Sequence, residues 1–392
     1  MPQPARRLDR IPPYLFADLD RQKRAVEASG KRVISFSIGD PDLPTADAVI
    51  ERMVEEAPRP EHHRYPPYEG TAGFRQAVSA YYRRRFSVAL DPERAVVAAI
   101  GSKEAISHLV WAYVDPGDTV IVPEPAYPVY ANQTLLAGGE VYVLPLAAER
   151  GFVADLKAIP QDVADRAKLL FLNYPHNPTG ALADLAFFEQ AVAFCRRHDI
   201  LLVSDAAYVE MTFGQQAPSV LQVPGANEVA VEFYSLSKPF NMTGWRLGAM
   251  VGQPAAVAAL KAVKANTDSG QFSAIQRAGQ EILTAGAEQF VLRMNEVYRA
   301  RRDLLVSGLR RLGWNVPEPA ATFYLWAAVP GGDDLEFVQR LLEEAGVALT
   351  PGQGFGQAGA GYARFALTVS EAEIEEALER LAGVLPAMLP KA

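Results

Sequence analysis

The stretch that decides the fold runs from residue 228 to residue 248 and reads EVAVEFYSLSKPFNMTGWRLG. Its first seven residues form an apolar, β-rich run, which is typical of a buried strand. Lys238 follows this strand between small hydroxyl residues, with Arg246 eight positions further on. Because ligands of α/β proteins bind beyond the carboxyl ends of the strands, this segment predicts a functional lysine at the edge of an α/β sheet.

Short strand patterns alternate with helical patterns between residues 96 and 252. The strand patterns are VVAAI, TVIVP, EVYVLPL, KLLFLNY, ILLVSD, VAVEFYS and LGAMVG, and helical patterns cover 102–114, 127–137, 184–198 and 254–266. This alternation is typical of a mainly parallel sheet with crossover helices. We therefore expect an α/β fold whose large domain contains a mainly parallel seven-stranded sheet.

The rest of the chain predicts a second, smaller domain. With 392 residues, the chain is longer than a single core usually supports. A long helical pattern from residue 287 leads to the strand pattern TFYLWAAV, a helix at 334–345, the strand pattern ARFALTV and a final helix from 371. The expected division is an N-terminal arm with part of the small domain at 1–45, a large domain at 46–286 and a small α+β domain at 287–392.

Composition narrows the classes of function. The chain carries 38 Lys and Arg against 46 Asp and Glu, and the net charge of −8 argues against a nucleic-acid or anionic-membrane surface. No apolar run approaches the roughly 18 residues of a membrane-spanning helix, and MPQPARRLDRIPPYLF lacks the apolar stretch of a signal peptide. Cys195 is the only cysteine and is expected to be a buried thiol. These features predict a cytoplasmic protein with small-molecule chemistry.

Groups suited to phosphate occur at two of the expected strand ends. Ser102 begins a helical pattern in GSKEAI, and the free N–H groups of a helix N-terminus attract phosphate. Ser235, Ser237 and Arg246 surround Lys238, and an arginine can bind two phosphate oxygens at once. Alone, Ser102 is typical of an ordinary helix cap and Arg246 of a surface residue. Together they indicate a phosphate group beside Lys238.

Other strand ends carry further polar or aromatic candidates. Asp205 ends the strand of ILLVSDAAY and could pair with a cationic ring nitrogen or cap a following helix, and Tyr208 lies three residues later. Asn177 belongs to NYPHNPTG, a turn that could hold its amide over a ligand. Tyr127 in PEPAYPVY offers a flat face for stacking, although packing would also explain it. Tyr65 in RYPPYEG lies on a loop whose target could belong to the same chain or to a neighbour.

Two other kinds of site are not supported. The stretch GFGQAG at 354–359 fits G-x-G-x-x-G, but it precedes a strand pattern instead of following a strand and opening a helix. The five histidines lack the spacing of a zinc site or a hydrolase triad. We expect neither a dinucleotide site nor a metal site.

Eight motifs resemble, in chain order, the motif series of the pyridoxal-phosphate-dependent class I and II aminotransferases of fold type I. They are IGDPD, YPPYEG, GSKEA, PAYPVY, NYPHNPTG, SDAAY, SLSKPFNMTGWRLG and ARFALT. The resemblance covers roughly residues 8 to 385. It implies an aspartate aminotransferase-like fold with pyridoxal 5'-phosphate as cofactor. It also implies an amino acid and a 2-oxo acid as substrates and an obligate homodimer with shared active sites.

The resemblance also implies roles for individual residues. Lys238 would hold the cofactor as a Schiff base and then move the proton at the substrate Cα. Asp205 would keep the ring nitrogen protonated, Tyr208 and Asn177 would hydrogen-bond the phenolic oxygen, and Tyr127 would stack on the ring. The residues implied for the phosphate are Ser102, Lys103 through its backbone, Ser235, Ser237, Arg246 and Tyr65 from the partner subunit.

The resemblance implies that Arg364 in YARFALT binds the substrate α-carboxylate, helped by the backbone of Gly39 and the amide of Asn177. Without the resemblance, an arginine in a strand pattern is more typical of an exposed edge.

For the substrate, PPYLF, IGDPD, LAGGEVYVLPL, VEFYSLSKPFNMTGWRLG and NTDSGQFSAIQ look most like the LL-diaminopimelate aminotransferase branch, which serves lysine biosynthesis with 2-oxoglutarate. In that branch Tyr14 and Lys103 would contribute to the substrate pocket. Tyr14 and Phe16 could equally pack as a proline-bounded arm, and polar groups for the distal end of the substrate are expected near Lys103 and in the 264–271 loop.

Several alternatives stay open. They are a broader aspartate, alanine or aromatic aminotransferase, an N-succinyl-diaminopimelate aminotransferase, a β-lyase or decarboxylase on the same fold, and a regulator that senses pyridoxal phosphate.

Overall fold

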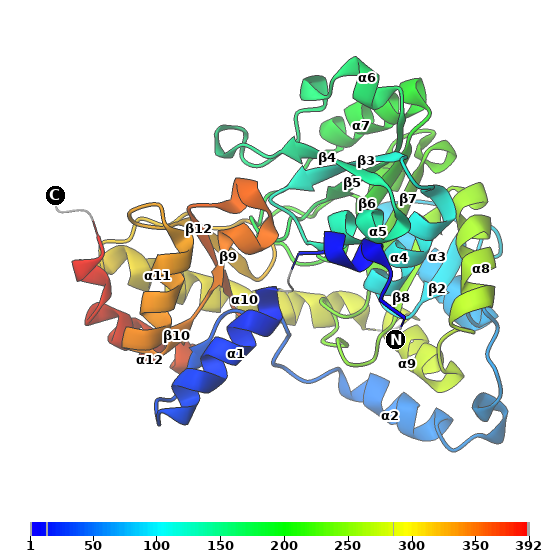
Figure 1. Cartoon of the computed structure of the whole chain (residues 1–392). Coiled ribbons are helices and arrows are strands. Elements are labelled where there is room, and N and C mark those ends of the chain that lie inside the picture. Colours follow the sequence, from blue (N-terminus) through cyan, green and yellow to red (C-terminus); the bar gives the residue numbers. More distant parts are fainter. Residues whose placement is uncertain (1, 13–14, 285, 390–392) are drawn as a thin grey trace.

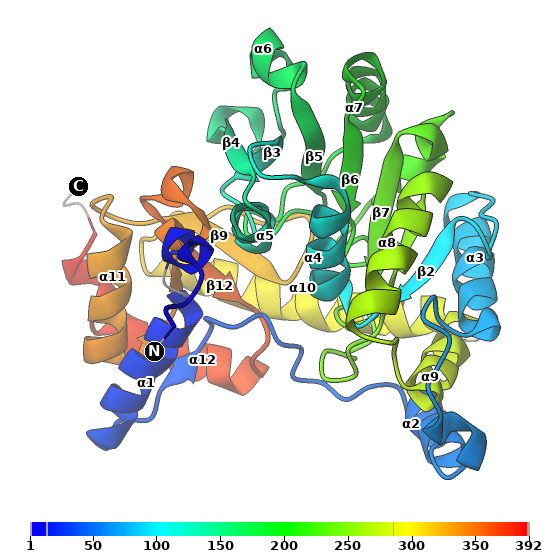
Figure 2. The same cartoon turned by 45° about the vertical axis from the view of Figure 1, so that its right-hand side comes forward.

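The seven strand patterns of the sequence form one sheet in the structure, a computed structural model that describes residues 2–12, 15–284 and 286–389. The strands are β2 (Val96–Ala99), β3 (Thr119–Glu124), β4 (Glu140–Pro145), β5 (Ala167–Asn173), β6 (Leu201–Asp205), β7 (Ala230–Ser235) and β8 (Gly248–Gly252). Their order is β2-β8-β7-β6-β5-β3-β4, and β8 runs opposite to the other six strands. The prediction of a mainly parallel seven-stranded sheet is confirmed (Figures 1 and 2).

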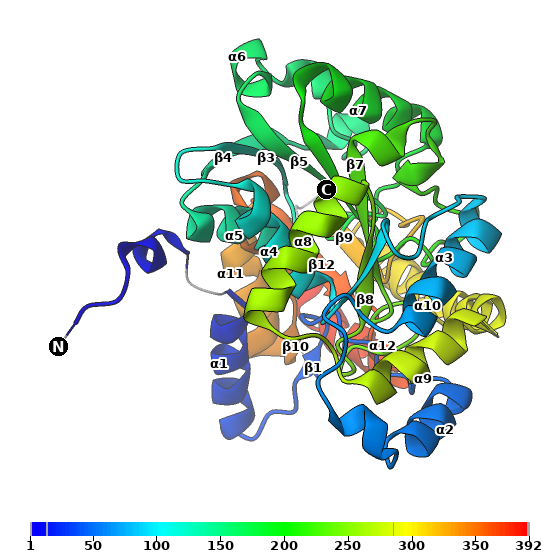
Figure 3. The same ribbon diagram turned by 90° about the vertical axis from the view of Figure 1, so that its right-hand side faces the viewer.

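Helices cover both faces of this sheet, and its strands other than the edge strand β4 are largely buried on both sides. In β5, Leu170 and Leu172 join the core on one face, whereas Leu169 and Phe171 join the core on the other. The first core includes residues of α3 (Ala72–Phe86), α7 (Leu185–His198) and α9 (Ser273–Thr284). The second includes residues of α4 (Ser102–Tyr113), α5 (Val129–Ala137) and α8 (Pro254–Thr267), and Figure 3 shows these two groups on opposite sides. Burial on both faces explains why these strands are continuous apolar runs in the sequence.

A second, smaller set of strands lies beside the large sheet. An antiparallel sheet has the order β11-β12-β9, with β9 at Tyr324–Ala328, β11 at Thr350–Pro351 and β12 at Tyr362–Ala366. In addition, β1 (Ile34–Ser35) pairs in parallel with β10 (Val347–Ala348). The helices of this part are α1 (Leu15–Ala28), α11 (Asp334–Arg340, continued by a π-helical turn at Leu341–Ala345) and α12 (Glu371–Ala382). An N-terminal strand is thus joined to the C-terminal part of the chain.

The long helix α10 (Ala287–Arg311) connects the two parts (Figure 1). Its residues Phe290 and Val291 belong to one core of the large sheet, whereas Tyr298 and Leu305 belong to the core around β9 and β12. Met294 packs against both cores. Helix α10 therefore contributes to the cores of both parts. The domain boundaries at residues 45 and 286 stay predictions.

Several smaller expectations can be compared with the structure. Cys195 is buried, as expected, and burial raises the pKa of its thiol. The GFGQAG stretch forms two 3-10 turns, Gly352–Phe355 and Gln357–Gly359, and opens no α-helix. Two further short helices are α2 (Asp47–Glu56) and α6 (Gln161–Ala164). In the part of the chain that the structure describes, no helix has the length and apolar character needed to cross a lipid bilayer.

Candidate active site

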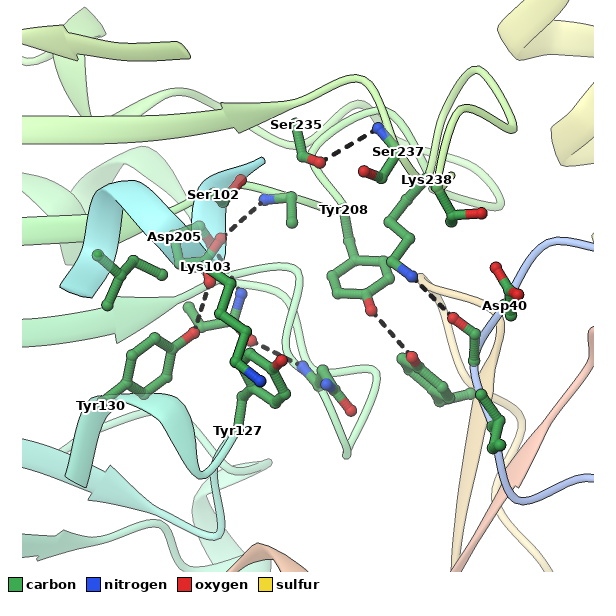
Figure 4. A pocket seen from close by; sticks show the side chains of 18 of the residues that line it. Asp40, Ser102, Lys103, Tyr127, Tyr130, Asp205, Tyr208, Ser235, Ser237 and Lys238 are labelled. Carbon is green, nitrogen blue, oxygen red and sulfur yellow. Dashed lines mark hydrogen bonds between the residues drawn. The ribbon is translucent and has the colours of Figure 1, made fainter. Parts of the chain in front are cut away.

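A cavity of about 490 Å³ lies at the carboxyl ends of β5, β6 and β7, where the large sheet meets β9 and β12 (Figure 4). Parallel pairing places the strand ends at one edge, with Asn173 opposite Asp205 in the register of β5 and β6. The sequence-predicted residues that line the cavity are Gly39, Ser102, Lys103, Tyr127, Asn177, Asp205, Tyr208, Ser235, Ser237, Lys238, Arg246 and Arg364. The structure thus gathers residues that are spread over more than 300 positions of sequence.

Two predicted site residues are not among these lining residues. Tyr65 is 89% exposed and does not line this chain's own cavity. Tyr14 lies outside the described residues. The cavity formed by this chain alone therefore lacks Tyr65.

Lys238 lies just after β7, and its Nζ donates a hydrogen bond of 2.7 Å to the backbone oxygen of Gly39 (Figure 4). Burial lowers the pKa of Lys238 to about 8, against the opposing charge of Asp40. The positive charges of Arg364 and Arg246 lower this pKa further. Near pH 8 about half of this amine is therefore neutral, the form that can attack a carbonyl carbon.

Asp205 is buried at the end of β6, and its carboxylate accepts two hydrogen bonds. One comes from the hydroxyl of Tyr130 at 2.7 Å, and the other from the backbone N–H of Ala207 at 3.2 Å. The amide of Asn173 donates to the backbone oxygen of Asp205 at 2.7 Å. Burial raises the pKa of the Asp205 carboxyl, while the two hydrogen bonds oppose that rise. A cation placed here would stabilise the ionised form. The alternative of a helix cap is wrong, because a turn follows Asp205.

The start of α4 and the turn after β7 form the end of the cavity that is suited to bind a phosphate group. Gly101 is the N-cap of α4, and Ser102 is its first residue, so Ser102 does not cap the helix as the simpler interpretation held. Its Oγ is buried, and among the described residues no group hydrogen-bonds it. A Cβ at Gly101 would overlap Nη2 of Arg246, so the missing side chain makes room for the guanidinium. A ligand oxygen here would satisfy the Ser102 hydroxyl and the free N–H groups of the helix.

Ser235 and Ser237 lie at the same end of the cavity, and the backbone N–H of Ser237 donates to Oγ of Ser235 at 3.2 Å. The serine hydroxyls, the start of α4 and Arg246 together suit a phosphate group chemically. The residues present therefore fit pyridoxal phosphate at this end.

Arg364 lies in β12, the central strand of the small sheet, and is 2% exposed. Its Nη1 donates to Oδ1 of Asn177 at 2.8 Å and its Nη2 to the backbone oxygen of Ser37 at 2.8 Å. The guanidinium carbon lies 4.1 Å from the ring centre of Tyr324 and 4.6 Å from that of Phe355. The alternative of an exposed edge residue is wrong. These contacts hold the guanidinium in a fixed orientation, as binding of a carboxylate requires.

Tyr208 and Tyr324 share a hydrogen bond of 2.9 Å between their hydroxyls. Tyr324 also lies close to Gly39, where a Cβ would overlap its hydroxyl. A larger residue at position 39 would push the tyrosine away from Tyr208. The glycine of IGDPD is therefore required for this packing.

Sequence reasoning missed several residues of the cavity, and three of them contact predicted site residues directly. Tyr130 follows Tyr127 by three residues in the PEPAYPVY motif, a spacing that a helical pattern would place on one face, and that spacing could have revealed it. Asn173 is the last residue of β5, in the KLLFLNY pattern. It lies opposite Asp205, the last residue of the neighbouring strand β6, which the sequence did reveal. Tyr324 lies within the TFYLWAAV strand pattern, where no signal separates a cavity residue from a core residue.

The segment 264–271 differs from the expectation of a loop beside the substrate. Helix α8 continues to Thr267, and no described residue of 264–271 lines this chain's cavity. Lys264 is 1% exposed, and its Nζ lies 3.0 Å from both Glu104 and Asp268. Glu104, Asp268 and His108 lie close enough together to hold a metal ion. The ammonium group of Lys264 already provides a positive charge for the two carboxylates. Lys264 therefore forms buried ion pairs between α8 and α4, outside the cavity.

Comparison with known proteins agrees with this site. A family model described as "Aminotransferase class I and II" matches residues 31–381. The LL-diaminopimelate aminotransferase of Moorella thermoacetica is 53% identical over 385 residues, which cover 98% of each chain. Among solved structures, a Thermus thermophilus aspartate aminotransferase mutant has a TM-score of 0.92 and 31% identity, covering 98% of this chain and 100% of that chain. A probable N-succinyldiaminopimelate aminotransferase, also from Thermus thermophilus, has a TM-score of 0.89 and 39% identity, covering 94% of this chain and 99% of that chain.

Proposed function

This chain belongs to the class I and II aminotransferases, and on that premise we propose that it moves an amino group between LL-2,6-diaminopimelate and 2-oxoglutarate in lysine biosynthesis. The 53% identity with a protein named LL-diaminopimelate aminotransferase, over nearly the full length of both chains, supports this substrate. The observation that carries the transaminase chemistry is the buried Lys238 amine in a cavity that also holds Asp205 and Arg364. We also propose a cytoplasmic location, which a biosynthetic role of this kind supports.

Enzymes of this family depend on pyridoxal 5'-phosphate. When bound, this cofactor supplies an aldehyde carbon for an amine and a protonated ring that draws electrons from the substrate Cα. The start of α4 with Ser102 and Lys103 would hold its phosphate together with Ser235, Ser237 and Arg246. Asp205 would hold the proton on the ring nitrogen, because a buried carboxylate is stabilised by a cationic partner. Tyr127 would stack on the ring.

The remaining residues would orient the substrate and handle its proton. Arg364 would bind the α-carboxylate through its two Nη atoms, next to the amide of Asn177 and the backbone of Gly39. Lys238 would hold the aldehyde and, once released, would take the Cα proton and return it. An amine with a pKa of about 8 can do both near neutral pH. Tyr208 and Asn177 would hydrogen-bond the phenolic oxygen.

A screen of amino donors in a single half-reaction tests the proposed substrate. We expect LL-diaminopimelate to consume the absorption band of the loaded enzyme with a kcat/KM at least about 10²-fold above that of aspartate or alanine. This difference follows if cavity groups hydrogen-bond the polar distal end of LL-diaminopimelate. Aspartate and alanine lack that end, so they would leave these buried groups unpaired, at a cost in free energy. Stopped-flow absorbance measures the rates, and N-succinyl-diaminopimelate is included as the competing donor.

Arg364→Lys is the matched control for this screen. Every donor has an α-carboxylate, so the variant should slow all of them alike and leave their ranking unchanged. Fast conversion of aspartate, alanine or the N-succinyl compound without conversion of LL-diaminopimelate would refute the proposed substrate. Release of ammonia or carbon dioxide in place of a 2-oxo acid would indicate a β-lyase or a decarboxylase instead.

We also propose that the protein is a homodimer in which Tyr65 completes the partner's phosphate site. Tyr65 is 89% exposed, which is a high exposure for a large aromatic residue, and it does not line its own chain's cavity. Exposed Tyr68, Ile50 and Val54 on the same loop and the nearby helix α2 add apolar surface. An apolar surface of this kind is typical of a subunit interface.

Hybrid dimers test this shared site. We expect Tyr65→Ala homodimers to bind pyridoxal phosphate about tenfold more weakly, from the loss of one hydrogen bond to a charged group. Lys238→Ala homodimers should be inactive. In a mixture of the two variants, one site of each hybrid combines an intact Lys238 with an intact Tyr65. Activity at limiting cofactor should therefore rise on mixing, and unchanged activity in a mixture shown to exchange subunits would contradict the shared site.

A further inference from the structure

Arg246 has an unusual backbone conformation. Its φ is +54°, in the left-handed region that residues other than glycine seldom adopt. Such a conformation persists where neighbouring contacts hold it in place. The contacts that hold Arg246 therefore determine where its guanidinium lies.

The side-chain amide of Gln271 provides these contacts. Its Nε2 donates to the backbone oxygen of Trp245 at 2.7 Å and to that of Arg246 at 2.8 Å. An amide nitrogen carries two hydrogens, so both are used on two successive carbonyl groups. Gln271 is 9% exposed and does not line the cavity. It acts on the backbone of Arg246 from outside the site.

Gln276 fixes Gln271 in turn. Nε2 of Gln276 donates to the backbone oxygen of Gln271 at 2.7 Å, and its Oε1 accepts from the backbone N–H of Thr71 at 2.6 Å. Gln276 is fully buried. The two glutamines thus connect the start of α3 to the turn that carries Arg246.

The position of the guanidinium depends on this turn. Nη2 of Arg246 lies so close to Gly101 that a Cβ there would overlap it, and Nη1 donates to the backbone oxygen of Thr243 at 2.9 Å. A rotation of the peptide group after Arg246 would therefore move the guanidinium away from the start of α4 and from Ser102. We propose that Gln271 is a positioning residue that holds Arg246 in place for the cofactor phosphate. This inference rests on the proposed role of Arg246 as a phosphate ligand.

The test compares two ligands that differ only in the phosphate. Gln271→Met keeps a similar volume but has no donor. We expect it to weaken binding of pyridoxal 5'-phosphate about tenfold or more, while binding of pyridoxal changes by less than about twofold. Equilibrium dialysis of the cofactor-free protein gives both affinities. Gln253→Ala is the matched control, because Nε2 of Gln253 also donates to a backbone oxygen, that of Glu228, away from the cavity. It should change neither affinity.

A double-mutant cycle with Arg246→Ala separates the inference from its premise. In the Arg246→Ala background, Gln271→Met should cause no further loss of pyridoxal-phosphate affinity, because its effect passes through the arginine. If Arg246→Ala itself leaves the preference for the phosphate form unchanged, the proposed role of Arg246 is wrong. If Arg246→Ala abolishes that preference but Gln271→Met and Gln271→Ala both retain it, the positioning role of Gln271 is overturned. Equal weakening of pyridoxal and pyridoxal phosphate would also overturn it, since that result indicates a general structural defect.

Discussion

Lys238→Ala is expected to lower kcat for transamination by about 10⁴-fold or more, because it removes both the group that holds the cofactor and the group that moves the Cα proton. Lys103 is the other lysine of the cavity, and burial followed by the charge of Arg246 also lowers its pKa. The two lysines are therefore the competing candidates for covalent attachment. Borohydride reduction of the loaded protein followed by peptide mass spectrometry distinguishes them, and we expect the adduct on Lys238.

The pH dependence of trapping gives a second readout for Lys238. The neutral amine is the reactive form, and the pKa of Lys238 is about 8. The rate of attachment to the cofactor-free protein should therefore rise with pH through about pH 8 and level off above it. Lys103→Ala is the control and should keep this profile. An adduct on another lysine, or full activity in Lys238→Ala, would refute the mechanism.

The large sheet could be predicted from the sequence because its strands are buried on both faces. Residues such as Leu169 to Leu172 alternate between two cores, so the run is apolar throughout and stands out between helical patterns. The small sheet was harder to delimit. Strands β10 and β11 have two residues each, too few for any periodicity, and β1 pairs with a strand more than 300 residues away. Pairing at that distance leaves no local signal.

In the candidate site, too, some residues could be predicted from the sequence and others could not. Asp205, Lys238 and Ser235 could be found because polar residues that end apolar strands are unusual. Tyr324 and Gln271 could not be found in this way. Tyr324 lies within a strand whose other residues are mostly buried, and Gln271 acts through the backbone of a residue 25 positions earlier. Contacts of that kind depend on tertiary packing, which a single sequence does not display.

Asp205→Asn is expected to slow the first half-reaction about 10²- to 10³-fold, the range found when one preorganised charge-stabilising group is removed. The asparagine has almost the same shape, but it carries no charge and cannot keep the ring nitrogen protonated. Stopped-flow loss of the cofactor band on mixing with LL-diaminopimelate measures this rate. Cofactor binding should be affected less than the rate, because the phosphate contacts at the start of α4 are unchanged.

Stability separates this chemical effect from misfolding. Burial raises the pKa of the Asp205 carboxyl, so the folded protein loses stability as the pH rises above the ordinary pKa of aspartate, about 3.9. Asparagine removes this cost, and cofactor-free Asp205→Asn should therefore melt at the same or a higher temperature at pH 7. Tyr130→Phe provides a graded control, since it removes only the 2.7 Å hydrogen bond to the carboxylate and should slow the half-reaction about tenfold. A half-reaction at the wild-type rate in a well-folded Asp205→Asn variant would show that the ring nitrogen takes its proton from elsewhere, and the site would then require a different electron sink.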